Sequence, residues 1–316
     1  MSPQPVVTVT LNPAIDQTLS IPGFATGRVN RVAESRSHAG GKGVNVACFL
    51  ADLGVEVIAA GFLGVENENL FVEAFKRKGI EDRFVRIAGA TRVGIKIVDD
   101  WTEQTTDVNF PGLTPTKEET GELFEGLASL AQPGMWFVLS GSVPSGVPDT
   151  IYAEMIESIH GKGGHVLLDT SGRPLQEALA SRPEVIKPNA QELGELIGEP
   201  VDMQGAVRAA TEFLRSRGLQ RVVVSMSNDG AVFVEPGRAL LARPPRVKVR
   251  STVGAGDAMV AGIVFATIRG LPLPELARVA TASGAYAVTR IGTGLEDREE
   301  YRNLIEQVGI EPLEEL

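Results

Sequence analysis

The chain has 316 residues, 43% of them hydrophobic, which is enough to bury one large core or two smaller ones and excludes disorder as the main state. Its formal net charge of -10 argues against a nucleic-acid surface or a polybasic membrane patch, so a phosphorylated ligand requires locally gathered cations. The single cysteine, Cys48, excludes an internal disulfide framework. No signal peptide or membrane-spanning apolar run stands out, so we expect a soluble cytoplasmic protein with no nucleic-acid or membrane partner.

Short β-branched runs alternate with segments of helical period along the chain. The runs 6–11 and 56–64 predict strands, whereas 44–54 and 69–79 predict helices, each closed by a glycine that suits a left-handed cap. Further strands are expected at residues 135–141, 164–172, 184–189 and 221–226. This alternation predicts an α/β fold, with a mainly parallel sheet that is flanked by helices on both faces and binds ligands at the carboxyl ends of its strands.

Two stretches interrupt the alternation. Residues 16–38 and 92–110 alternate polar and apolar side chains without helical period, which predicts half-exposed antiparallel strands. They would form a small sheet over the strand ends, so we expect one α/β core spanning 1–316 with a discontinuous β lid. From residue 255 onward the chain is expected to be mostly helical, and the acidic EPLEEL at 311–316 to be a solvated tail.

The first predicted strand leads into TLNPAID, residues 10–16. A dinucleotide-binding protein carries Gly-x-Gly-x-x-Gly there, and the absence of that motif argues against a dehydrogenase. Asp16 is a candidate acceptor of hydrogen bonds from sugar hydroxyls, with a turn residue as the alternative.

Three glycines and Lys42 precede a predicted helix in HAGGKGVNVA, residues 38–47. The spacing does not match a P-loop, because Lys42 is followed by Gly43 instead of Ser or Thr. Small side chains still let a ligand approach the backbone, while Lys42 offers a positive charge and Asn45 an amide on the first helical turn. The alternative is a tight turn between strand and helix.

Two other enzyme classes lack their motifs. LSGSVPSG, residues 139–146, follows a strand and is rich in hydroxyls, but it does not contain the Gly-x-Ser-x-Gly of a serine hydrolase. The histidines show no zinc spacing either. Solvated or capping roles are expected for His38, His160 and His165.

In IKPNAQEL, residues 186–193, Lys187, Asn189 and Glu192 surround a strand end and a helix start. An Asn and a carboxylate three residues apart lie on one helical face and suffice for nucleotide-bound Mg²⁺, which keeps most of its waters. The same pair suits a capping box, and the sequence leaves both interpretations open.

The run STVGAGDAMVAG, residues 251–262, places small residues at the start of an apolar helix, where free backbone amides attract anions. Asp257 lies there, either as an N-cap or as a base that takes a proton from an attacking hydroxyl. The glycine pair of RIGTGLED, residues 290–297, could bring carbonyls near this loop and hold a monovalent cation, or could form a plain turn.

Taken together, GGKGVNVA with ADLG, and STVGAGDAMVAG, resemble the N-terminal and C-terminal signatures of the ribokinase-like sugar kinases, also called the PfkB family. The resemblance covers nearly the whole chain. It implies that the amides of Gly254, Ala255 and Gly256 join an anion hole and that Asp257 is the catalytic base. It also implies ATP as phosphoryl donor, and a lid that closes over the sugar and forms a homodimer. The implied nucleotide contacts are Lys187, Asn189, Glu192 and Ser225, of which Asn189 and Glu192 would hold Mg²⁺, in part through water.

Within that family, TLNPAID, GGKGVN, GFLG, TRVGIKI and TDVNFPG are most similar to members that act on sugar phosphates, the 1-phosphofructokinases and tagatose-6-phosphate kinases. Arg92 is the cation with the best motif match, and Arg28 has the loosest. The expected substrate-binding residues are Asp16, Arg28, Gly40, Gly41, Lys42, Asn45, Arg92 and Ser140. Ser251 stands where the family often has Asp or Asn, so a site for a monovalent cation such as K⁺ stays open.

The resemblance implies phosphorylation of the free primary hydroxyl of fructose 1-phosphate, with tagatose 6-phosphate and fructose 6-phosphate as alternative substrates. A non-catalytic sugar-phosphate sensor is the alternative from another class, although a sensor has no use for a base at Asp257.

Overall fold

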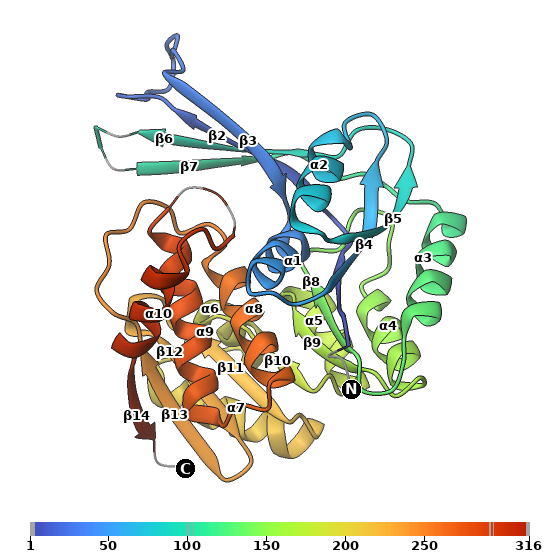
Figure 1. Ribbon diagram of the computed structural model, residues 1–316, viewed down its shortest axis with the longest axis vertical. Helices are drawn as coiled ribbons and strands as arrows, with labels where there is room; N and C mark the ends of the chain where they lie inside the picture. The colour runs from blue at the N-terminus through green and yellow to red at the C-terminus, as the bar shows by residue number, and fades with distance from the viewer. Residues whose placement is uncertain (1–3, 100, 103, 291, 293, 314–316) are drawn as a thin grey trace.

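The computed structural model describes residues 4–99, 101–102, 104–290, 292 and 294–313. These residues form a ten-stranded sheet with helices on both faces, and a four-stranded sheet that projects from one end of it (Figure 1). The predicted fold class, α/β with a mainly parallel sheet and a small second sheet, is confirmed.

The ten strands lie in the order β14-β13-β12-β11-β10-β9-β8-β1-β4-β5. Neighbouring strands from β11 to β5 run parallel, whereas β12, β13 and β14 add an antiparallel edge. Their bounds are β1 Val6–Thr10, β4 Val57–Gly64, β5 Glu81–Ile87, β8 Trp136–Ser140, β9 His165–Asp169, β10 Val185–Ile186, β11 Arg221–Ser225, β12 Ala231–Glu235, β13 Arg238–Arg243 and β14 Gly309–Leu313. Every strand predicted above for this sheet is present, while β5, β12, β13 and β14 were not anticipated.

Among the described residues, ten α-helices cover the sheet, and two 3₁₀ turns lie in its connections, Leu179–Ser181 between α5 and β10 and Ser227–Asp229 between β11 and β12. Their bounds are α1 Lys42–Asp52, α2 Asn69–Lys78, α3 Lys117–Leu130, α4 Ile151–His160, α5 Gly172–Ala178, α6 Ala190–Ile197, α7 Met203–Arg217, α8 Ala255–Ile268, α9 Leu273–Val288 and α10 Arg298–Gln307. The glycines predicted to close the first two helices adopt the left-handed conformation, with φ of 82° at Gly54 and 67° at Gly79.

Two apolar cores lie on opposite faces of the sheet. One joins it to α1, α2, α8, α9 and α10, and the other joins it to α3 through α7 (Figure 1). In β1, Val6 belongs to the first core, whereas Val7 and Val9 belong to the second, because successive side chains of a strand point to opposite faces. The parallel strands are therefore apolar on both sides.

Helix α8 is buried along most of its length, which explains why its sequence is apolar without an amphipathic pattern. A Cβ at Gly262 would lie 2.7 Å from Cα of Ala280, so the glycine lets α8 pack closely on α9. Among the described residues, no helix is both long and apolar enough to cross a membrane.

The second sheet has the order β3-β2-β6-β7, with bounds β2 Ala14–Ser20, β3 Glu34–Gly40, β6 Val93–Asp99 and β7 Gln104–Asn109. It occupies the two stretches expected to form the lid, apart from residues 100 and 103, which lie outside the described residues. Its central strands β2 and β6 run parallel, so the prediction of antiparallel pairing was wrong there. Strands β2 and β3 form one hairpin, and β6 and β7 form another. The chain leaves the main sheet along β2 and β6 and returns along β3 and β7, so the two outgoing strands lie side by side.

The C-terminal segment also differs from the prediction. Its residues 309–313 form β14, which pairs with β13, so 311–313 are not a solvated tail; residues 314–316 lie outside the described residues. Ile310 and Leu313 pack against the two cores, and the Glu311 carboxylate accepts a 2.7 Å hydrogen bond from Arg243 of β13. An acidic edge strand is stabilised by such cross-strand pairs.

Candidate active site

The order of the strands reverses beside β1. The chain adds β4 and β5 on one side of β1, and then places β8 and the later strands on the other side. Thr10, Ser140 and Asp169 end β1, β8 and β9, and they lie in one row of the register. In open α/β sheets such a reversal leaves a crevice at the carboxyl ends of the strands, where ligands bind.

Asp169 joins two lysines from different elements. Its carboxylate lies 3.3 Å from Nζ of Lys42, the first residue of α1, and 3.2 Å from Nζ of Lys187, which follows β10. Burial alone would raise the pKa of Asp169, but the two ammonium groups hold that pKa below its ordinary value. Burial also opposes the charge of Lys42, yet its pKa is raised because the carboxylates of Asp169, Asp257 and Glu192 surround it. The cluster therefore gathers two lysine side chains around one buried carboxylate at the strand ends.

Asp257 lies in the first turn of α8 and is 7% exposed. Nδ2 of Asn45 donates a 2.7 Å hydrogen bond to its Oδ2. Burial and the nearby carboxylate of Asp169 raise the pKa of Asp257 to about 6, against the opposing effects of the lysines and of the hydrogen bond. Asp257 is not a cap, because the N-cap of α8 is Gly254 and no side chain caps that end. A buried carboxylate that titrates near neutral pH is suited to accept a proton.

The N-terminus of α8 has the features of an anion site. The amides of Ala255, Gly256 and Asp257 belong to the first turn, where a helix offers them no acceptor. Gly254 begins the helix in the left-handed conformation, with φ of 76°. A Cβ at Gly256 would lie 3.6 Å from Nζ of Lys187, so that ammonium group flanks the turn. Free amides, the helix dipole and a cation together favour a bound anion such as phosphate.

Asn189 and Glu192 form the capping box that the sequence left open. Oδ1 of Asn189 accepts a hydrogen bond from the amide of Glu192, and Oε2 of Glu192 accepts one from the amide of Asn189, both at 2.8 Å. Both side chains stay partly exposed, and Glu192 contributes to the raised pKa of Lys42, so its carboxylate faces the lysine cluster. Two oxygen donors with room for water fit Mg²⁺.

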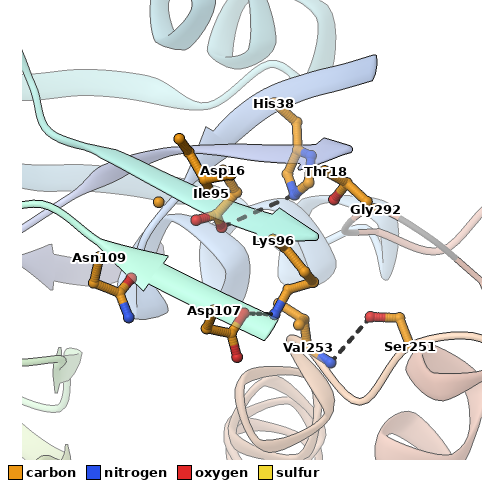
Figure 2. A pocket seen from close by; sticks show the side chains of 11 residues that line it. Asp16, Thr18, His38, Ile95, Lys96, Asp107, Asn109, Ser251, Val253 and Gly292 are labelled. Atoms are coloured by element: carbon orange, nitrogen blue, oxygen red, sulfur yellow. Dashed lines mark hydrogen bonds and ion pairs between the residues drawn. The ribbon is translucent and has the colours of Figure 1, made fainter. Parts of the chain in front are cut away.

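A cavity of about 230 Å³, named the lid cavity after the lid expected from the sequence, lies between the second sheet and the loop before α8 (Figure 2). Its polar lining consists of Asp16, Thr18, His38, Lys96, Asp107, Asn109 and Ser251. Asp16 faces His38 on the neighbouring strand, with Oδ2 3.9 Å from Nε2, while Lys96 contacts Asp107. Burial raises the pKa of Asp16, although His38, Arg92 and Lys96 oppose that rise.

The glycine pair before α1 is required by close approach. A Cβ at Gly40 would lie 2.1 Å from Oδ2 of Asp16, and a Cβ at Gly41, where φ is 106°, would lie 2.9 Å from Cα of Pro13. Side chains at these positions would displace the Asp16 carboxylate and the turn. The two glycines therefore connect β3, whose His38 lines the lid cavity, to Lys42 at the start of α1.

The two arginines predicted to bind the substrate, Arg92 and Arg28, lie in different parts of the structure. Arg92 is half-buried next to β6, its Nη2 donates a 3.4 Å hydrogen bond to the carbonyl of Asn12, and it lies near enough to Asp16 to lower that residue's pKa. Arg28 lies in the connection between β2 and β3, exposed, with its guanidinium against the carbonyl of Gly23. Neither Arg28 nor Arg92 lines the cavity, so the substrate contacts of both stay predictions.

A second cavity, of about 710 Å³, lies on the other side of the α8 start. Ser225, Ala255 and Gly256 line it together with apolar side chains of α8 and α9. Its volume is within the range of sites for drug-sized ligands and cofactors. Ser251 lines the lid cavity, so the loop that leads into α8 separates two cavities.

Asp169 and several polar side chains of the lid cavity, His38 among them, were missed from the sequence. Asp169 lies in the predicted strand 164–172 and is the last residue of β9. The available signal was an aspartate near a strand end, but other predicted strands also end in polar residues. His38 was assigned a solvated or capping role, but it lines the lid cavity. Its strand position opposite Asp16 could not be known before the register of β2 and β3.

The remaining histidines and the cysteine lie away from this region. His160 and His165 both contact Glu184, at 3.2 and 3.3 Å. Cys48 is buried in α1, where burial raises the pKa of its thiol to about 11. Within the described part of the chain, no group of His, Cys, Asp and Glu side chains could hold a metal ion by itself.

Comparison with known proteins gives a consistent result. The model of the pfkB family carbohydrate kinases matches residues 5–299. The chain is 45% identical over 309 residues to 1-phosphofructokinase of Rhodobacter capsulatus, covering 98% of each chain. It is 35% identical over 308 residues to 1-phosphofructokinase of Escherichia coli strain K12, covering 97% of this chain and 98% of the relative.

Crystal structures of phosphofructokinase-2 from Escherichia coli are similar along nearly their whole length. The complex with substrates and products has a TM-score of 0.91 at 28% identity, and the complex with potassium has a TM-score of 0.90 at 28% identity. Each comparison covers 96% of this chain and 98% of the other.

Proposed function

The chain belongs to the pfkB family of carbohydrate kinases, and we propose that it transfers the γ-phosphate of ATP to the primary hydroxyl of fructose 1-phosphate, giving fructose 1,6-bisphosphate. The full-length relatives named 1-phosphofructokinase support this choice of substrate. The observation that carries the proposal is Asp257, a buried carboxylate with a pKa raised to about 6 in the first turn of α8, the helix whose preceding loop borders both cavities.

Asp257 orients and deprotonates the primary hydroxyl. As the hydroxyl oxygen forms its bond to the γ-phosphorus, the bond from that phosphorus to the bridging oxygen breaks, and ADP leaves with that electron pair. The proton passes to the Asp257 carboxylate, which Asn45 holds in place at 2.7 Å. Base assistance of this kind contributes roughly a hundred- to ten-thousandfold.

The anion site at α8 receives the transferred phosphoryl group. Amides of Ala255, Gly256 and Asp257 face its oxygens, and Lys187 and Lys42 add positive charge from two other elements. Because these groups are fixed before the reaction, they stabilise developing charge without rearranging. Gly254 allows the tight entry into the helix.

Asn189 and Glu192 are the residues proposed to hold Mg²⁺, in part through water. When bound, the ion neutralises charge on the phosphates of ATP. Glu192 also caps α6 and faces Lys42 without the ion, so the arrangement of side chains at the strand ends does not depend on Mg²⁺.

The lid cavity is proposed to take the sugar phosphate. Asp16, which lines the cavity, accepts hydrogen bonds from sugar hydroxyls. Arg92 and Lys42 are proposed to attract the phosphate, and the Ser140 hydroxyl, buried without a described partner, is a further proposed donor, although these three residues are not part of the cavity lining. Gly40 leaves room for the Asp16 carboxylate, which a Cβ at that position would meet at 2.1 Å. ATP is proposed to occupy the larger cavity, where Ser225 offers a hydroxyl.

A monovalent cation such as K⁺ is a proposed accessory near the loop of Ser251. The potassium complex of the Escherichia coli phosphofructokinase-2 supports it. Ser251 would be a weak ligand for this cation, because it offers one hydroxyl, which already accepts a 3.2 Å hydrogen bond from the amide of Val253. The opposite turn at 290–297 contains residues 291 and 293, which lie outside the described residues.

We also propose that the chain is one α/β unit whose second sheet acts as a lid and joins two copies into a homodimer. Exposed apolar side chains gather on that sheet and its connections, and burying them against a second copy would remove them from water. They are Val29, Val32, Trp101, Val108 and Phe110.

The test compares kcat/KM for fructose 1-phosphate, tagatose 6-phosphate, fructose 6-phosphate and fructose, with ADP release as the signal. Preference for fructose 1-phosphate is expected. Asp257→Asn should lower kcat by at least about a hundredfold while the protein stays folded. Preference for a 6-phosphate would move the specificity to one of the alternative substrates. Sugar-phosphate binding without turnover would favour the sensor.

A further inference from the structure

His38 is a polar side chain of the lid cavity to which the proposed chemistry gives no role. It lies directly opposite Asp16 in the register of β3 and β2, and both side chains line the cavity (Figure 2). They are 26% and 27% exposed, so both keep one side open to the cavity. A cross-strand pair that only stabilised the lid would have no need of this opening.

The distance between the two side chains is the informative feature. Nε2 of His38 lies 3.9 Å from Oδ2 of Asp16, which is too long for a hydrogen bond between them. A hydroxyl oxygen placed about 2.8 Å from each atom fits beside this gap. Such a hydroxyl would donate its proton to the carboxylate and accept one from Nε2–H, so both of its polar functions would be used.

The surrounding groups fix Asp16 and leave His38 available. Oδ2 of Asp16 lies over Gly40, where any Cβ would meet it at 2.1 Å. Lys96 is engaged by Asp107 on the neighbouring strand. Among the described residues, no basic side chain other than His38 lies within ion-pair distance of the Asp16 carboxylate. The His38 imidazole is therefore placed to act together with Asp16.

From this geometry we propose that His38 and Asp16 bind one secondary hydroxyl of the sugar phosphate as a donor and acceptor pair, which makes His38 a specificity-determining residue of the substrate site. This inference rests on the proposed function, because it assumes that the lid cavity takes the sugar. Burial lowers the pKa of His38 against the influence of Asp16, so the neutral imidazole is the form present at neutral pH. Its Nε2–H tautomer supplies the donor.

The test compares His38→Leu, which removes the donor, with His38→Gln, whose amide nitrogen can reach the position of Nε2. His38→Leu should raise KM for fructose 1-phosphate by roughly ten- to a hundredfold, the loss typical of an unpaired group in a site built for a hydroxyl, with kcat and the KM for ATP nearly unchanged. His38→Gln should recover most of this loss. The matched control is His160→Leu, because His160 is similarly exposed, at 29%, and pairs with Glu184.

Deoxy analogues of the sugar phosphate provide a second readout, measured by calorimetric binding. The analogue that lacks the recognised hydroxyl should bind wild type and His38→Leu equally, whereas other analogues should distinguish them. Equal affinity of wild type and His38→Leu for every sugar phosphate would overturn the assignment of His38, and so would equal losses in the leucine and glutamine variants. Neither result would affect the proposed function, which fails instead if wild type does not phosphorylate fructose 1-phosphate. In that case the same variants are compared by binding of the other sugar phosphates.

Discussion

Asp257→Asn should stabilise the fold at neutral pH while it removes activity. Burial and Asp169 raise the pKa of Asp257 from 3.8 to about 6, which means that the folded state disfavours the ionised carboxylate. Each tenfold change in proton affinity corresponds to about 1.4 kcal/mol, so ionised Asp257 destabilises the fold by about 3 kcal/mol. An asparagine of nearly the same shape removes that penalty, and for a chain of this length the gain is about 4 °C in Tm.

The sign of the effect depends on pH. The folded chain holds the Asp257 proton up to pH about 6, whereas the unfolded chain releases it near pH 3.8. The contribution of this group to stability is therefore fully present below pH 3.8 and is lost as the pH rises through about 6. Because asparagine does not titrate, wild type and variant should be similar at the acid end of this window and differ most above it.

Equilibrium urea unfolding at pH 5 and pH 8 measures this difference directly. The gain for Asp257→Asn should be clearly larger at pH 8. Asp149→Asn is the control for the chemical change alone, because the Asp149 side chain is 44% exposed and exposed ion pairs contribute little. A variant that is less stable than wild type at pH 8, or a gain that is the same at both pH values, would refute the reasoning.

Two further substitutions test the charges around this carboxylate. Asn45→Leu removes the hydrogen bond that lowers the pKa of Asp257, so the acid limb of the kcat/KM profile should move up by about one to two pH units. Although the substrate phosphate also titrates near pH 6, it is the same in both measurements, and an unmoved limb would contradict the role of Asn45. Asp169→Asn leaves Lys42 and Lys187 without their shared counter-charge, and urea unfolding should show a loss of about 3 to 5 kcal/mol. Unchanged stability would mean that the two lysines do not depend on this carboxylate.

The parts of the fold that the sequence predicted are those with strong local signals. The buried parallel strands are continuous apolar runs, and the helices between them end at glycines. Strand β14 was missed because its Glu311 is paired across the sheet edge with Arg243, a contact that acidic composition does not reveal. The parallel pairing of β2 and β6 was missed for a similar reason, since it depends on where two hairpins leave the main sheet.

The candidate site divides in the same way. Residues that lie in short contiguous motifs, such as Lys42 and Asp257, could be nominated from spacing and small neighbours. Asp169 and His38 could not, because their significance comes from partners distant in sequence. Asp169 becomes important only when the pairing of β9 with β10 places it beside Lys187 and the start of α1 brings Lys42 to it, and His38 only when β3 pairs with β2.

The charge balance of the inner cluster explains why a carboxylate can lie at a helix end that attracts anions. Above pH about 6, Asp257 and Asp169 carry two negative charges, and Lys42 and Lys187 carry two positive ones, so the four side chains are neutral together. The arrival of a phosphate makes the site negative, and the α8 amides and the two lysines supply the attraction that holds it. A divalent cation that entered with the nucleotide would restore the balance. The same arithmetic predicts that Asp257 has a lower affinity for its proton when Mg²⁺ is bound nearby, since a cation favours the ionised form.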